Sequence, residues 1–263
     1  MTDLIKADYY RILKSKLFLI LTIICFVLPI LTALTYLIME KVIALSSDFT
    51  GIEGLNISGR LLISESFALS SNMGLILSIF ITIFIATDVS NGTLRNKLIA
   101  GKSRTSIYFS HFITTATISA TLILMNVLVF ILFTCLLFGY GATLDGAEMV
   151  RIVFFLITGI ITFVFSASIS TAITLSIKSS AASVIITVLA GMGFSIIASL
   201  VHQADPLLDK TWLCIIPTYT NSSFLASGIF KWQSFVIGIL SYLIFGTAIT
   251  LAGLYFFKKK DVK

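Results

Sequence analysis

Six long apolar runs constrain the fold of this chain more than any other feature of its sequence. They cover about residues 17–39, 68–87, 107–138, 152–177, 183–201 and 235–257. A helix needs roughly 20 apolar residues to cross the hydrocarbon of a bilayer, and each run has about that length. The runs are continuously apolar, whereas the strands of a membrane barrel alternate apolar and polar residues. The sequence therefore predicts an all-α integral membrane protein with six transmembrane helices.

The composition excludes most other classes of protein. Only 11% of the 263 residues are charged, whereas soluble chains carry roughly 25%. Little length is left for a soluble domain, so we expect residues 1–263 to form a single transmembrane domain. The net charge of +6 would indicate nucleic acid in a soluble protein, but here we expect no nucleic-acid partner. The three cysteines (Cys25, Cys135 and Cys214) are far apart and show no disulfide or metal pattern.

The basic residues between the runs predict the orientation. With the N-terminus inside, 13 of the 18 Lys and Arg residues fall in cytoplasmic segments, and only five fall outside. The five outside are Lys41, Arg60, Arg151, Lys210 and Lys231. Because cytoplasmic loops are enriched in Lys and Arg, we expect both termini to be cytoplasmic. The first run also resembles a secretory signal, but it is too long, so we expect an uncleaved helix kinked at Pro29.

One cytoplasmic loop, residues 88–106, has a pattern of its own. Gly92 permits a sharp turn, Thr93 can cap a helix from Leu94 to about residue 100, and Gly101 can end it. Leu94 and Leu98 are four residues apart and share a face of that helix, with Ile99 beside them and with Arg95 and Lys97 pointing elsewhere. The pattern predicts a short amphipathic helix on the cytoplasmic surface. The alternative is a basic loop that only fixes topology.

No motif indicates catalysis, so we assign no catalytic, cofactor-binding or metal-binding residue and do not expect an enzyme. The Gly-Lys-Ser at 101–103 looks like the end of a phosphate-binding loop, but Asn96 stands where that motif needs Gly. Ser195 and His202 could form an intramembrane protease site, yet the helical rise places them about 10 Å apart. The runs also lack the buried charges that ion-coupled carriers need.

Small and weakly polar residues form stripes with a spacing of four. The second run carries Ser70, Gly74, Ser78 and Thr82, and the fourth and fifth runs have similar stripes. Small residues let helix backbones approach closely, so we favour tight packing. A dimer face or a lining for a substrate path is the alternative. Asn126 lies alone in the third run and needs a polar partner, which indicates a role in packing.

This combination of features resembles the permease subunits of ABC-2-type transporters. The sharpest match is Asp88-x-x-x-Gly92-Thr93-Leu94-Arg95-x-x-Leu98, followed by Arg104 and the third run. Asp88 stands where the family more often has Glu. Residues 1–16 look like the family's amphipathic N-terminal helix, and residues 202–234 fit its extracellular or re-entrant segment. The resemblance implies a type V exporter-like permease architecture, similar to that of small bacterial peptide and drug exporters.

The resemblance also implies partners and a function. Two permease chains, identical or different, would pair in a bacterial cytoplasmic membrane above two separate ATPase subunits, which would hold ATP and Mg. The coupling helix would be formed by the loop residues Asp88, Gly92, Thr93, Leu94, Arg95, Leu98 and Arg104. The substrate would be amphipathic or hydrophobic, with an antimicrobial or toxin-like peptide as our expectation. The alternatives are an ATP-independent channel or carrier and, less favoured, an intramembrane protease.

Overall fold

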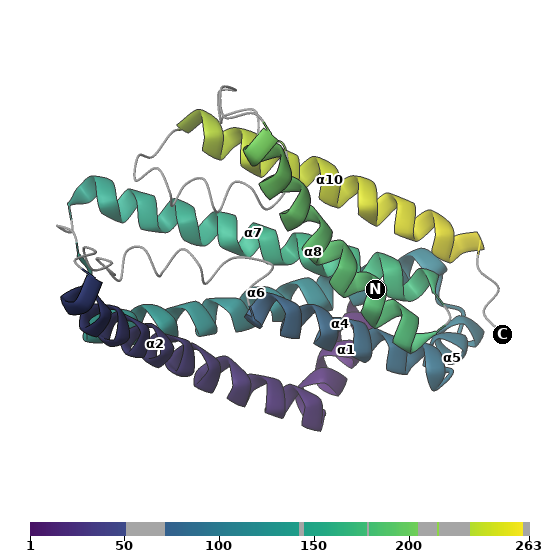
Figure 1. The fold of residues 1–263 in the computed structure, drawn as a ribbon. Coiled ribbons are helices and arrows are strands. Elements are labelled where there is room, and N and C mark those ends of the chain that lie inside the picture. Colours follow the sequence, from purple (N-terminus) through teal and green to yellow (C-terminus); the bar gives the residue numbers. More distant parts are fainter. Residues whose placement is uncertain (51–71, 142–144, 178, 205–214, 216–231, 260–263) are drawn as a thin grey trace.

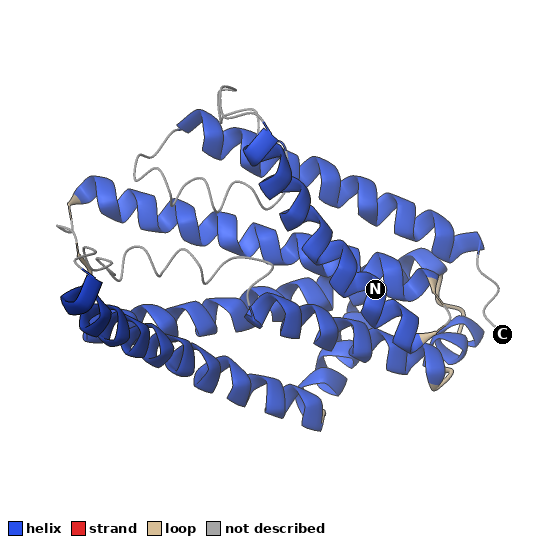
Figure 2. Ribbon diagram, in the orientation of Figure 1, coloured by secondary structure: helices blue, strands red, loops and turns tan. Residues whose placement is uncertain are grey.

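The computed structural model describes residues 1–50, 72–141, 145–177, 179–204, 215 and 232–259. This part of the chain is almost entirely helical and contains no strand (Figure 2). Its helices are α1 (Thr2–Lys14), α2 (Lys16–Thr50), α4 (Asn72–Ser90), α5 (Thr93–Ile99), α6 (Arg104–Phe138), α7 (Gly146–Ser176), α8 (Ser180–Ala204) and α10 (Trp232–Lys259). The prediction of an all-α protein is therefore confirmed.

Five helices in the described ranges are long and apolar enough to cross a membrane. The candidate spans are Lys16–Val42, Met73–Ser90, Arg104–Phe138, Glu148–Ser176 and Phe235–Lys259. They correspond to five of the six apolar runs. The remaining run lies in α8, where the described apolar stretch, Ser180–Gly193, is shorter than a span. The chain is thus a multi-pass membrane protein, with five candidate spans in the residues that the structure describes.

Helix α7 lies at the centre of the bundle and contacts α4, α6, α8 and α10 (Figure 1). Its stripe of small polar residues is buried: Thr158, Thr162, Ser166, Ser170 and Thr174. Several of these hydroxyls donate to carbonyls one turn earlier in the same helix, as Thr162 Oγ1 does to Thr158 O at 2.9 Å. These hydroxyls therefore have hydrogen-bond partners within α7 itself. The small side chains let α4, α6, α8 and α10 pack closely against the α7 backbone.

The stripe on α4 also faces helices of the same chain. Ser78 Oγ lies 2.9 Å from Ser166 Oγ on α7, and Thr82 Oγ1 donates to Thr187 Oγ1 on α8 at 3.3 Å. Gly74 is buried as well, whereas Ser70 lies outside the described residues. Three of the four stripe residues thus support packing within one chain. A role in a dimer or along a substrate path stays a prediction.

Pro29 and Asn126 form a matched pair in the hydrocarbon region. Proline has no N–H, so Pro29 leaves the carbonyl of Cys25, four residues earlier in α2, without its helical donor. Asn126 Nδ2 from α6 donates to that oxygen at 3.1 Å, and its side chain is only 3% exposed. A neighbouring helix therefore satisfies the backbone group that proline freed, as membrane helices require.

Several helix ends with basic side chains lie together at one end of the bundle. Ser15 ends α1, and its Oγ accepts from Phe18 N at 3.1 Å at the start of α2. Arg104 Nη1, at the start of α6, donates to the carbonyls of Phe257 (3.1 Å) and Lys258 (2.9 Å) at the end of α10. Figure 1 shows α5 and the end of α10 at the same end of the bundle.

Candidate functional site

The 88–106 loop folds into a short helix, α5, bounded by two glycines. Gly92 precedes it with a left-handed φ of 70°, and Gly101 follows it with a φ of 77°. At the C-terminus, Gly101 N donates to Leu98 O at 3.0 Å and Lys102 N donates to Lys97 O at 3.2 Å. This pair of bonds is the Schellman arrangement that glycine favours. The predicted stop at Gly101 is confirmed.

The start of α5 differs from the prediction by one residue. Thr93 is the first residue of the helix, and Gly92 occupies the N-cap without any side-chain capping bond. The prediction that Thr93 caps the helix is therefore wrong. The sharp turn at Gly92 begins the helix directly, so the threonine hydroxyl is not placed to accept from the next turn.

The two faces of α5 have different environments. Leu94 is 3% exposed within the hydrophobic core of its own chain, and Leu98 packs against the same core. Arg95 and Asn96 are exposed, and Ile99 is 74% exposed. The leucines share a face, as predicted, but that face is turned toward the bundle. The accessible face of α5 consists of Arg95, Asn96 and Ile99.

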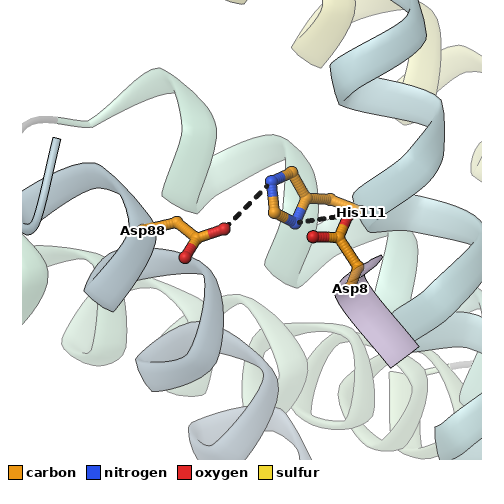
Figure 3. A group of neighbouring side chains, drawn as sticks. All are labelled: Asp8, Asp88 and His111. Carbon is orange, nitrogen blue, oxygen red and sulfur yellow. Dashed lines mark ion pairs between the residues drawn. The ribbon is translucent and has the colours of Figure 1, made fainter. Parts of the chain in front are cut away.

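Beside α5 lies a cluster of buried and partly buried ionisable side chains, which we call the charge cluster: Asp8, Arg11, Asp88, Lys97 and His111. Figure 3 shows Asp8 on α1, Asp88 on α4 and His111 on α6 converging on one point. Asp8 is 1% exposed, Asp88 is 3% exposed and His111 is fully buried. Nε2 of His111 lies 3.4 Å from Asp88 Oδ2, and its Nδ1 lies 3.9 Å from Asp8 Oδ2.

Lys97, from α5, places its ammonium group at the centre of the charge cluster. Its Nζ lies 2.7 Å from Asp8 Oδ1, 3.6 Å from Asp88 Oδ2 and 3.5 Å from His111 Nε2. The side chain of Lys97 is only 12% exposed. One lysine therefore links α5 to α1, α4 and α6, the elements that surround it.

Arg11 supplies the second positive charge. Its guanidinium pairs with Asp88 Oδ1 and lies 3.6 Å from Asp8 Oδ1. The same group stacks over the ring of Phe84 at 4.5 Å from the centroid. Two carboxylates thus face two basic side chains, and this pairing offsets part of the cost of burying the charges.

The environment of Asp8 favours its charged form. Burial by itself raises the pKa of Asp8, but His111, Lys97 and the hydroxyl of Ser110 outweigh it and hold the pKa below the usual 3.8. Ser110 Oγ donates to Asp8 Oδ2 at 2.7 Å. Because the folded pKa is lowered, this contribution to stability is present above pH 3.8 and is lost as the pH falls through the lowered value.

Asp8, Asp88 and His111 could geometrically hold a metal ion, since their ligand atoms lie within 4.8 Å of one another. The ammonium of Lys97 already fills the space between them, however. A divalent cation would have to displace Lys97 and would then lie beside Arg11. The geometry is therefore that of an ion-pair network.

The structure brings together residues that the sequence analysis kept apart. Asp88 is in the charge cluster, whereas Gly92 and Thr93 form the start of α5 and Arg95 lies on its exposed face. Arg104 donates to carbonyls at the end of α10, and its role in coupling stays a prediction. The sequence analysis did not assign roles to Asp8, Arg11 or His111, and it placed Lys97 on a face that points away.

A signal for Asp8 was present in the sequence. Leu4, Asp8 and Ile12 are spaced by four residues, and all three are buried in α1. An acidic residue in the middle of an apolar stripe needs a cation across the interface. The pattern predicts such a partner but does not identify it as Lys97, which lies 89 residues away on α5.

Comparison with known proteins identifies the family. No curated protein matches the chain. The family described as "ABC-2 family transporter protein" matches residues 4–195. The matched region runs from α1 into α8 and includes α5 and all of the charge cluster. Families of this kind are transporter permeases, which are generally not enzymes and generally work with an ATPase subunit. The chain therefore belongs to the ABC-2 family of transporter proteins.

Proposed function

We propose that this chain is the membrane-spanning permease subunit of an ATP-driven exporter in a bacterial cytoplasmic membrane. In this proposal α8 also crosses the membrane, as the fifth of six spans, and both termini are cytoplasmic. Two such chains, identical or different, pair above two separate ATPase chains that bind ATP and Mg. The cargo is an amphipathic or hydrophobic molecule, for which an antimicrobial or toxin-like peptide is our candidate.

The observation that carries the proposal is the two-sided environment of α5. One side is anchored in the bundle by Leu94 and by the pairs that Lys97 forms with Asp8 and Asp88. The other side exposes Ile99 beside Arg95 and Asn96. An apolar side chain flanked by polar ones is the composition of a protein docking face. A force applied to the exposed side would reach α1, α4 and α6 through the charge cluster.

Family membership and the short cytoplasmic loops support a separate ATPase. The loop that contains α5 has no phosphate-binding motif, because Asn96 stands at the position that needs Gly. The energy for transport would therefore come from another chain. We propose Ile99, Arg95 and Asn96 as the residues that contact it.

The test is purification of the tagged chain from its own cells in a gentle detergent, with an ATPase assay of the product. We expect a stoichiometric ATPase chain and turnover that vanadate inhibits. Ile99→Asp should abolish co-purification without unfolding the permease, because Ile99 is 74% exposed. The matched control is Ser90→Asp, which adds the same charge at an exposed position outside α5 and should retain the ATPase.

Two results would contradict the proposal. A permease that purifies without any ATPase in both detergent and nanodiscs would remove its basis. Flux through liposomes that contain only this chain, without ATP, would establish a channel or carrier instead. If the ATPase co-purifies but Ile99→Asp has no effect, the transporter function stands and the role of α5 is wrong.

A further inference from the structure

A second candidate site lies within the spanning part of the bundle, and no residue of the charge cluster lines it. A cavity of about 320 Å³ opens between α6, α7 and α10. Phe112, Val164, Gly246, Thr247 and Leu251 are among its lining residues, and Leu251 is 63% exposed at the rim. We call it the lateral groove. It lies within the candidate spans, so any occupant comes from the bilayer or reaches it through the bilayer.

Two glycines on α10 explain why a groove exists here. A Cβ at Gly253 would meet Ala172 Cβ at 2.5 Å and the Tyr108 hydroxyl at 2.6 Å, so the helices nearly touch at that point. Two turns earlier, a Cβ at Gly246 would make only ordinary contacts, with Phe165 Cδ2 at 3.7 Å and Ser168 Oγ at 4.0 Å. The helices are close at Gly253 and leave room at Gly246.

The chemistry of the lining requires an apolar occupant. Its serine and threonine hydroxyls already donate within their own helices: Ser168 to Phe165 O at 2.7 Å, Thr247 to Leu243 O at 2.8 Å and Thr250 to Gly246 O at 2.7 Å. The rest of the lining is aliphatic or aromatic, and Tyr242 adds one phenolic hydroxyl. A ligand that brought polar groups into the groove would gain few hydrogen bonds in return.

The dimensions and the charges indicate a lipid. Residues 242–251 of α10 line the groove over about 14 Å, close to the roughly 15 Å of hydrocarbon in one leaflet. Lys258 and Lys259 are exposed about 10 Å beyond Leu251, at the depth of the headgroups. Lys259 Nζ lies 4.5 Å from the ring centroid of Tyr255, an arrangement typical of an interfacial anchor. Basic side chains at this depth attract anionic headgroups.

We propose that the lateral groove binds one acyl chain of an anionic phospholipid whose headgroup lies against Lys258 and Lys259. This inference requires only that the chain is a membrane protein and does not depend on the transport proposal. The bound lipid would fill space between α6, α7 and α10 that the protein itself leaves open.

The experiment uses the full chain in nanodiscs that contain phosphatidylglycerol with a photoreactive diazirine in the middle of one acyl chain. Phosphatidylcholine with the same chain is the matched probe. We expect cross-links at Phe112, Val164 and Thr247, with labelling by phosphatidylglycerol roughly tenfold above that by phosphatidylcholine. Combined Lys258→Ala and Lys259→Ala should remove this preference and leave the phosphatidylcholine labelling unchanged.

Two variants test occupancy of the groove. Gly246→Leu should fill it and reduce labelling at least fivefold, whereas Gly246→Ala should retain labelling. Thr247→Trp blocks the groove from its exposed rim and should act like Gly246→Leu, so a folding defect in one variant does not decide the result.

Three outcomes would overturn the proposal. Labelling spread evenly over exposed positions such as Leu189, which is 62% exposed, would indicate ordinary bilayer contact. Unchanged labelling in both Gly246→Leu and Thr247→Trp would place the lipid elsewhere. Competition by an amphipathic peptide, with none by unlabelled phosphatidylglycerol, would assign the groove to a different ligand.

Discussion

At the carbonyl of Cys25, Asn126 supplies the hydrogen bond that Pro29 removes from the helix. Pro29 removes the helical donor, and Asn126 Nδ2 replaces it at 3.1 Å in a site that excludes water. Each residue would be costly without the other: the asparagine would be a buried polar group and the carbonyl would be unsatisfied.

We therefore predict that Asn126→Leu destabilises the protein by about 1–2 kcal/mol in detergent, measured by thermal unfolding. In a Pro29→Ala background, the restored backbone N–H can donate to the Cys25 carbonyl, so the same change should cost distinctly less. Equal losses in the two backgrounds would mean that this hydrogen bond contributes no stability.

Lys97 is a second residue whose removal would take a partner from buried groups, since it pairs with Asp8 and Asp88. Lys97→Met leaves Asp8 and Asp88 beside Arg11 and His111 but removes the ammonium group between them, and we expect a loss of about 3 kcal/mol. Adding Asp8→Asn should recover part of it, because one uncompensated carboxylate is removed. Thermal unfolding of the single and double variants measures this, with Lys102→Met at an exposed position as the control. A double variant no more stable than Lys97→Met would argue against the pairing.

At the scale of helices, the close approach of α10 to α7 determines how the bundle is built. We predict that Gly253→Ala destabilises the protein by about 1–3 kcal/mol, because a Cβ there would lie 2.8 Å from Ala172 Cα and backbone would have to move. Gly246→Ala on the same helix should be neutral or slightly stabilising, since its nearest contact is 3.7 Å. Unfolding temperatures of the two variants make the comparison. Equal changes of unfolding temperature in the two variants would contradict the close approach of α10 to α7 at Gly253.

At the scale of the whole molecule, the sides of the membrane can be tested by labelling. The contacts between Arg104 and the end of α10, and between Lys97 and α1, bring both ends of the described chain to one end of the bundle. We predict that single cysteines at Lys102 and Lys259 react only with a permeant thiol reagent in intact cells, while one at Asp145 reacts with an impermeant reagent. Labelling of position 102 from outside would reverse the orientation, and labelling of 102 and 259 from opposite sides would contradict the structure.

The sequence by itself determined the class of fold, the approximate places of the spans and the short helix of the 88–106 loop. These depend on local properties: hydropathy over about 20 residues, and the backbone freedom of Gly92 and Gly101. Within the spans, the hydrocarbon also requires helical structure, because an unpaired backbone group there is too costly.

Only the tertiary structure decided which side of α5 is accessible, what Asn126 binds and how the charge cluster forms. The periodicity of α5 placed Leu94 and Leu98 on one face, but an apolar face can meet its own bundle or a partner equally well. Asp8 and Lys97 are 89 residues apart, and neither residue's local sequence specifies the other. Such partners are chosen by how the helices pack, since the energy of a buried charge depends on what lies across the interface and not on its own neighbours in the chain.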